Sequence, residues 1–294
     1  MILNNNSLME TPLKSSGEQG IFNKLDWVKE ADGKLISAKL LREIALNKKL
    51  ELDALQARKI IDGEKLTSKE VFEIYNIQES ANKSSVLILG YAIELLLKSG
   101  VVSLLINAPK NLLEKKVKAY SHKLLNIALD LHFSLSSEEQ HLLETLSSYI
   151  IRETRYPVTP NSINDYCEKT NQIRTFISSE YQFSLGVQFF ERLRSFIKDI
   201  DGTSDNIKFH SRMEMEKNGY ITFRVGGCLP PVFIVKFCQS QISSGTATID
   251  TVKYLLIEKN KVSKSIQSNL MEKYWDKAIF YTVNDKKGLI KTTT

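Results

Sequence analysis

Apolar residues recur with helical spacing through the first two-thirds of the chain. The first such segment contains Leu35, Ile36, Leu40, Leu41 and Ile44, and its pattern continues through Leu55, Ile60 and Ile61. Spacings of three and four residues place side chains on one face of a helix. Gly63 follows directly and is a typical helix stop. We therefore expect a long helix that ends just before Gly63.

Capping boxes predict where two further helices begin. In such a box the side chain of a Ser or Thr accepts a hydrogen bond from the backbone N–H of a Glu three residues later. The side chain of that Glu accepts one from the backbone N–H of the Ser or Thr. Residues 67–70 and 136–139 have this pattern. The first box opens a helix that we expect to run unbroken to Gly100. The second opens a helix that Pro157 ends, because the residue before a proline is pushed out of helical geometry.

Three more segments complete the expected helices. One covers about residues 112–131. Another begins after Pro157, with Thr159 as the N-cap and Pro160 at the first helical position. The last contains "SLGVQFFERLRSFIKDIDG" and closes at residues 201–202.

The pattern changes after Gly202. Residues 219–225 and 232–238 are short, β-branched and aromatic-rich, which is typical of strands, and "GGCLPP" separates them. Residues 264–283 predict a helix followed by another strand. The expected fold class is therefore α+β. It comprises a disordered tail at 1–20, an all-α helical bundle at 21–202 and a smaller α+β domain at 203–294.

Composition is that of a globular protein. The 294 residues are 42% hydrophobic and carry a net charge of +6, which permits an acidic partner such as RNA without requiring one. Segment 86–106 is strongly apolar, but Glu94 and Lys98 lie four residues apart inside it, so we expect a buried soluble helix and no membrane contact. The three cysteines form no C-x-x-C pair and the polar N-terminus lacks the pattern of a signal peptide. We expect a cytoplasmic protein.

No motif predicts a cofactor, a metal site or a catalytic residue. The chain lacks a phosphate-binding loop, a nucleophile elbow and a zinc-protease motif. The glycines of "VGGCLPP" precede prolines and are best explained as a turn between strands. Cys228 beside them could be a nucleophile if the fold brought His210 close. His122 and His132 are ten residues apart on one predicted helix, so they point in different directions and give no metal pattern.

Two pairs of charged residues are candidates for ligand binding. Glu94 and Lys98 are spaced to pair on a helix surface, either as a structural ion pair or as part of a polar cleft with Tyr91. Arg152 and Arg155 lie one turn apart where their helix ends. The helix dipole favours cations there by about 0.3–1 kcal/mol each, which alone explains them. The alternative is a clamp for a phosphate or carboxylate.

Three segments resemble the HEPN superfamily of helical-bundle domains. They are "YAIELLLKSG" with Glu94 and Lys98, "SHKLLNIALDL" with His122, and "LSSEEQHLLETLSSYIIRETRYPV", which closes in Arg-Tyr-Pro at Arg155. The resemblance covers about residues 25–200. It implies four or five packed helices and allows a homodimer, since HEPN domains often dimerise.

Many HEPN domains are metal-independent ribonucleases of toxin–antitoxin, phage-defence and RNA-processing systems. They use an Arg followed, after four to six residues, by His, and no arginine of this chain has a histidine at that spacing. The resemblance therefore implies a member without the motif. We expect a non-catalytic module that binds RNA or a nucleotide, in a prokaryotic defence or mobile-element conflict system. Its ligand would contact Glu94, Lys98, His122, Arg152 and Arg155.

Two alternatives stay open. The chain could be a scaffold that binds a protein partner, which an exposed apolar patch or an unpaired strand edge would favour. It could also be a metal-independent ribonuclease with a rearranged site. His122 would then act as general acid or base, and Arg155 would stabilise the charge of the transition state.

Overall fold

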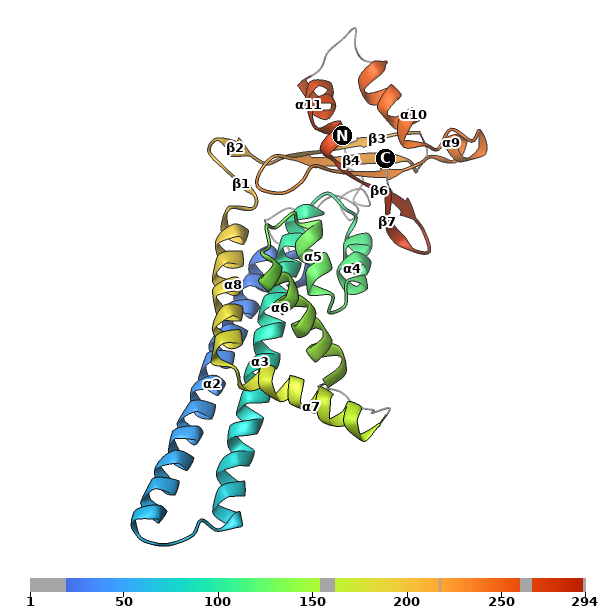
Figure 1. Ribbon diagram of the computed structural model, residues 1–294. Helices are drawn as coiled ribbons and strands as arrows, with labels where there is room; N and C mark the ends of the chain where they lie inside the picture. Colours follow the sequence, from blue (N-terminus) through green and yellow to red (C-terminus); the bar gives the residue numbers. More distant parts are fainter. Residues whose placement is uncertain (1–19, 154–161, 217, 260–265, 293–294) are drawn as a thin grey trace.

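The computed structural model describes residues 20–153, 162–216, 218–259 and 266–292. It has an α+β layout in which a helical bundle and a mixed sheet occupy opposite ends of the molecule (Figure 1). The expected tail at 1–20, apart from Gly20 itself, and the expected helix start at Thr159–Pro160 lie outside the described residues.

Two long antiparallel helices form a hairpin whose distal end projects beyond the other helices (Figure 1). They are α2 (Lys24–Ile61), preceded by the short 3-10 helix η1 (Gly20–Phe22), and α3 (Ser68–Leu104). The expected end of α2 before Gly63 is confirmed, and so is the capping box at the start of α3. The buried positions of α2 recur every three or four residues, at Val28, Ala31, Leu35, Ala38, Arg42 and Ala45. That spacing keeps one face of α2 against α3.

The C-terminal half of α3 is the centre of the bundle. α3 is the one described helix long and apolar enough to cross a membrane, yet 72% of its most apolar window is buried inside the protein. Most of this apolar stretch is therefore enclosed by the other elements of the bundle, and the buried helix that the sequence predicts is present. Neighbouring elements pack closely on its glycines. A Cβ added at Gly100 would lie 2.6 Å from Leu131 Cδ1, and one at Gly90 would lie 3.0 Å from Ile150 Cδ1.

Shorter helices pack around α3. They are α4 (Lys110–Ala119), α5 (Leu124–Asp130), α6 (Ser137–Ser148), the π-helix η2 (Tyr149–Glu153), α7 (Ile163–Ser178) and α8 (Glu180–Asp199). The capping box at the start of α6 is confirmed. The single helix expected over 112–131 is wrong, because α4 and α5 are separated by a turn in which Ser121 has a φ of 50°. The apolar spacing continues across this turn, so periodicity alone does not reveal it.

After α8 the chain forms a small ribbon, β1 (Gly202–Thr203) with β2 (Asn206–Ile207), and then a five-stranded sheet. Its strands in spatial order are β3 (Phe209–Glu214), β4 (Tyr220–Val225), β5 (Val232–Lys236), β6 (Ile279–Asn284) and β7 (Gly288–Thr292). Neighbours are antiparallel except β5 and β6, which are parallel. The predicted β4, β5 and β6 are confirmed, whereas the edge strands β3 and β7 were not expected.

Helices connect the two parallel strands and cover one face of the sheet (Figure 1). They are α9 (Gln239–Ser243), α10 (Ile249–Lys253), the π-helix η3 (Tyr254–Glu258), α11 (Ile266–Tyr274) and the 3-10 helix η5 (Trp275–Lys277). The helix expected before β6 is thus present as α11. On this face Phe233 and Phe280 pack with Val252, Met271 and Trp275 in a separate apolar cluster.

The opposite face of the sheet belongs to the core of the bundle. Val232, Ile234, Ile279 and Tyr281 are buried in the same apolar cluster as the central residues of α3. Alternate residues of β5 and β6 thus face two different cores, as the period of two in a strand requires. One continuous core therefore runs across residue 202, where the composition of the chain changes.

Candidate functional site

A charged cluster in the bundle brings together three of the five residues expected to bind a ligand. Glu94 Oε1 accepts a hydrogen bond from Lys98 Nζ at 2.5 Å, and Glu94 Oε2 lies 2.8 Å from His122 Nδ1. The exposed fraction of the side chain is 6% for Glu94, 12% for Lys98 and 19% for His122. The carboxylate is therefore deepest, and both basic side chains are nearer to solvent. We call these three residues the Glu94 cluster.

Two elements position the Glu94 cluster. Glu94 and Lys98 are one turn apart on α3, as the sequence predicts. His122 comes from the turn between α4 and α5, not from a helix, so the expectation that it shares one helix with His132 is wrong. The turn is held in place because Ser147 Oγ on α6 accepts a hydrogen bond from the backbone N–H of Leu124 at 3.1 Å.

Burial explains why the carboxylate has two partners. A carboxylate removed from water is costly unless it is paired and hydrogen-bonded. Lys98 and His122 each take one oxygen of Glu94. The predicted pairing of Glu94 with Lys98 is confirmed, and His122 is a second partner that the sequence did not indicate. The aromatic ring of Tyr91, also on α3, lies 6.2 Å from that of His122, centroid to centroid.

This arrangement orients two hydrogen-bonding groups. A carboxylate at Nδ1 fixes the imidazole ring and turns its Nε2 edge away from the carboxylate, as in histidines that transfer protons or bind ligands. The ammonium group of Lys98 has three donors, of which one serves Glu94. Glu94 therefore acts as a buried anchor that holds one lysine and one histidine at fixed positions.

The π-helix η2 contains the backbone of Arg152, one of the two candidate arginines. η2 follows α6 directly, and its Ile150 contacts α3 at Gly90, one turn before Glu94. π-helical turns recur at functional sites. The backbone of Arg152 is part of η2, but its side chain and all of Arg155 lie outside the described residues. The choice between a helix cap and a ligand clamp therefore stays a prediction.

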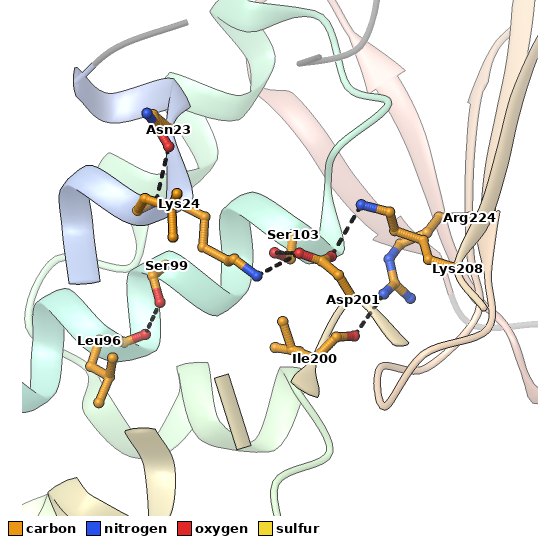
Figure 2. A network of polar contacts seen from close by, with 10 residues as sticks. Asn23, Lys24, Leu96, Ser99, Ser103, Ile200, Asp201, Lys208 and Arg224 are labelled. Carbon is orange, nitrogen blue, oxygen red and sulfur yellow. Dashed lines mark hydrogen bonds and ion pairs between the residues drawn. The ribbon is translucent and has the colours of Figure 1, made fainter. Parts of the chain in front are cut away.

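A second charged network joins the bundle to the sheet (Figure 2). Asp201, which follows α8, accepts hydrogen bonds from Lys24 Nζ at 2.6 Å, Lys208 Nζ at 3.2 Å and Ser103 Oγ at 3.2 Å. Burial alone would raise the pKa of Asp201, but the bonds and charges of the two lysines outweigh it and lower that pKa. Asp201 therefore stays ionised at neutral pH and ties α2, α3 and the strand region together.

Arg224 lies next to this network and is almost completely buried (Figure 2). Its guanidinium donates to the carbonyl oxygens of Gly226 at 3.0 Å and Ile200 at 3.2 Å. Burial lowers the pKa of Arg224 to about 10, against the favourable charge of Asp201. Sequence reasoning missed this residue, although a single arginine inside the apolar "GYITFRV" is a signal of a partnered buried cation.

A third polar cluster lies where α4 and α5 meet β6 and β7. The Tyr120 hydroxyl donates to Asp130 at 2.5 Å, and Lys291 Nζ of β7 donates to the same carboxylate at 2.8 Å. The Lys116 ammonium lies 4.6 Å from the ring centroid of Tyr120 and 5.3 Å from that of Tyr281. Burial lowers the pKa of Lys116 and raises the pKa of both tyrosines. The cluster links the bundle to the last two strands.

Other residues considered in the sequence have structural surroundings. Arg192 pairs with Glu139 at 2.6 Å, and Arg194 pairs with Asp32 at 3.1 Å. Cys228 is exposed in the turn between β4 and β5. The glycine pair before it makes that turn, because Gly226 and Gly227 both have positive φ and lie against backbone oxygens. Within the described part of the chain, no group of three or more His, Cys, Asp and Glu side chains could hold a metal ion.

No family model, no curated protein and no solved structure matches this chain.

Proposed function

We propose that this chain is a HEPN-like cytoplasmic module that binds RNA or a nucleotide through the Glu94 cluster, in a prokaryotic defence or mobile-element conflict system. The observation that supports the proposal is the convergence of Glu94, Lys98 and His122, which come from the segments that resemble HEPN domains. In the proposed complex, Lys98 donates a hydrogen bond to a phosphate group, and the imidazolium form of His122 donates a second one from Nε2. Glu94 does not contact the ligand and keeps the two donors in position.

The size of the effect follows from the nature of these contacts. A hydrogen bond between charged groups contributes about 1.5–3 kcal/mol, which is roughly a tenfold to hundredfold change in affinity. Phosphate contacts also make binding weaken as salt rises. Arg152, whose backbone is part of the π-helix that contacts α3 near Glu94, and Arg155, three residues later in the sequence, are further candidates for the same phosphate.

The test is a titration of labelled single-stranded RNA at two salt concentrations. The variant is Lys98→Gln with His122→Gln. Each glutamine can still donate a hydrogen bond to the buried Glu94 carboxylate but carries no positive charge. Lys118→Gln is the matched control, since Lys118 forms the same i,i+4 pair with Glu114 at 2.6 Å but 71% of its side chain is exposed. We expect the double variant to bind at least about tenfold more weakly and the control to bind as the parent does. Equal binding by the parent and the folded double variant would refute the proposal.

The same titration tests the ribonuclease alternative. The 2.8 Å contact between Glu94 Oε2 and His122 Nδ1 favours proton transfer by this histidine. Shortening of the RNA by the parent protein, lost in His122→Gln, would identify a nuclease. RNA that is bound but stays intact would favour the non-catalytic binding module over the nuclease.

A second candidate function is protein binding through the distal hairpin. Leu46, Leu50, Ala54, Ala57 and Ile61 are all exposed and are spaced by three or four residues. The less exposed positions of the same stretch, such as Leu52 and Leu55, lie on the other side of α2, toward α3. The exposed side chains thus form one apolar stripe on the outer face of α2, on the part of the hairpin that projects from the bundle (Figure 1).

An apolar stripe of this kind is typical of helices that pair with another helix. Sedimentation velocity at increasing concentration tests whether a second copy of the chain is the partner. Leu50→Asp should then shift the protein to monomer. Ile242→Asp is the control, because Ile242 is similarly exposed but lies on the sheet end of the molecule. A parent that stays monomeric at all concentrations contradicts self-association.

A further inference from the structure

A pocket of about 460 Å³ lies at the sheet end of the molecule, away from the Glu94 cluster. Its floor is the face of the sheet that carries α10 and α11. Phe237 follows β5, Thr282 lies in β6 and Thr292 lies at the end of β7. Its walls are the first turn of α10 and the 3-10 helix η5. The volume is within the range of pockets that bind small molecules, about 300–1,000 Å³.

The pocket lies beside the parallel pair of strands in the sheet. β5 and β6 form the parallel pair of the sheet, and the helices between them make the crossover connection. Phe237 marks the carboxyl end of β5, and Thr282 is in the second half of β6. The lining also includes Trp275 and Asp276, which precede β6, and Thr292, which pairs with Phe280 near the start of β6. The pocket therefore lies over the face of the sheet, between the parallel pair and the crossover helices.

One wall of the pocket is aromatic and rigid. Trp275 is buried, and its ring centroid lies 5.0 Å from that of Phe233 and 4.8 Å from that of Phe280. These contacts fix the indole plane before any ligand enters. Phe237, Ala247 and Ile249 add further apolar surface. A planar, apolar ring system is the chemistry that such a wall accepts.

The remaining lining groups are polar and nearly balanced in charge. The Thr282 and Thr292 hydroxyls lie 3.4 Å apart on the floor, where they can donate or accept hydrogen bonds. Asp250 and Asp276 line the pocket with Lys253, whose Nζ is 3.7 Å from Asp276 Oδ1. Two carboxylates and one ammonium leave a net charge of −1. A ligand with hydroxyl or amino groups is favoured here over one with several phosphates.

We propose that this pocket binds an uncharged heteroaromatic molecule that carries hydroxyl groups, of the size and chemistry of a nucleoside. The ring contacts Phe237 and the small part of Trp275 that reaches the pocket, the threonine hydroxyls bond its polar edge, and the aspartates accept hydrogen bonds from the hydroxyl groups. The proposal does not depend on RNA binding at the Glu94 cluster, because the two sites share no residue.

Tryptophan fluorescence reports directly on the pocket. The chain has two tryptophans, Trp27 and Trp275, so Trp27→Phe in the full chain leaves Trp275 as the only indole. The probes are adenosine, guanosine, cytidine and uridine, each beside its 5′-monophosphate, with excitation near the red edge of indole absorption. We expect a saturable change in Trp275 emission with at least one nucleoside and weaker binding of its monophosphate.

Substitution of a lining residue then tests whether the nucleoside binds in this pocket. Thr282→Val keeps the β-branched shape and removes one hydroxyl from the floor, and we expect it to weaken nucleoside binding by at least about tenfold. Thr203→Val, on an exposed strand outside the pocket, is the matched control and should bind as the parent. Lys98→Gln with His122→Gln should leave nucleoside binding unchanged, and Thr282→Val should leave RNA binding unchanged.

Three results would overturn the proposal. They are the absence of a saturable signal with all four nucleosides, a monophosphate that binds as tightly as its nucleoside, and a signal that Thr282→Val does not alter. The second result would assign recognition to Lys253 and to an anionic ligand. The third would place the nucleoside elsewhere on the protein.

Discussion

Replacement of Asp201 by Asn tests how strongly the bundle and the sheet depend on each other. Asp201 is the shared acceptor for Lys24 at 2.6 Å and Lys208 at 3.2 Å (Figure 2). The side chains of these lysines are 20% and 19% exposed, and that of Asp201 is 29% exposed. Asn removes the negative charge, keeps one acceptor and turns an N–H₂ group toward one of the ammonium groups.

The expected cost lies between two limits. Exposed ion pairs contribute about 0–1 kcal/mol, whereas removal of one partner from a fully buried pair costs about 3–5 kcal/mol. The partial exposure of all three side chains allows water to replace part of each lost bond, but two cations lose their partner at once. We therefore expect Asp201→Asn to lower the free energy of unfolding by about 2–3 kcal/mol at pH 7.

The pH dependence supplies a second check. Because the folded state lowers the pKa of Asp201, its ionised form stabilises the fold above the unfolded-state pKa of about 3.9. That contribution is lost as the pH falls through the folded-state pKa. The difference between the parent and Asp201→Asn should be constant from about pH 7 to 5 and should shrink below about pH 4.

Urea unfolding followed by circular dichroism measures both quantities, and a double-mutant cycle with Lys24→Met isolates the pair. Glu191→Gln is the control, because the pair of Glu191 with Lys39 at 3.4 Å is exposed on both sides. It should change stability by less than about 1 kcal/mol. A cost for Asp201→Asn no larger than that of the control, or a cost that does not change at low pH, would show that the network is not a stabilising junction.

Four further substitutions test other parts of the fold, each by urea unfolding of the variant and its parent. Tyr120→Phe loses the bond to Asp130 and should cost about 1–2 kcal/mol at pH 8. Because burial raises the pKa of Tyr120, the parent should lose stability as the pH rises above about 10. The difference in unfolding free energy between the parent and Tyr120→Phe should therefore be smaller above about pH 10 than at pH 8. An equal difference at these two pH values would contradict this. Gly100→Ala places a methyl group 2.6 Å from a leucine side chain and should cost about 1–3 kcal/mol, whereas Gly33→Ala, with no neighbour within 4 Å, should stabilise α2 by up to about 1 kcal/mol; the reverse order would refute the close packing. Thr67→Ala removes the capping box of α3 and should cost about 1 kcal/mol, and an unchanged midpoint would show that the cap does not matter.

The helices and their ends could be predicted because their signals are local. The capping boxes at Thr67 and Ser136 need residues three apart, and the stop before Gly63 needs one residue. Each is satisfied within a single turn of the chain, so no distant contact can overrule it easily. The turn between α4 and α5 was missed because the apolar spacing continues through it.

The Glu94 cluster was predicted in part for the same reason. The pairing of Glu94 with Lys98 follows from the i,i+4 geometry of one helix. His122 is 28 positions from Glu94 in the sequence, and the contact between them depends on where the turn after α4 lies against α3. The resemblance to HEPN domains pointed to the same three residues, but it did not predict which atoms meet.

The sequence by itself determined part of the local structure of this protein: the end of α2, the starts of α3 and α6, the central strands and the change of composition near residue 202. These depend on neighbours a few positions apart, for which backbone geometry and side-chain spacing are sufficient. Only the tertiary structure decided that one face of the sheet completes the core of the bundle, that Asp201 and Arg224 lie at their junction, and that Phe237, Trp275 and Thr282 enclose a pocket. Those contacts join residues that are distant along the chain, and their pairing depends on how whole elements pack, which no short stretch of sequence encodes.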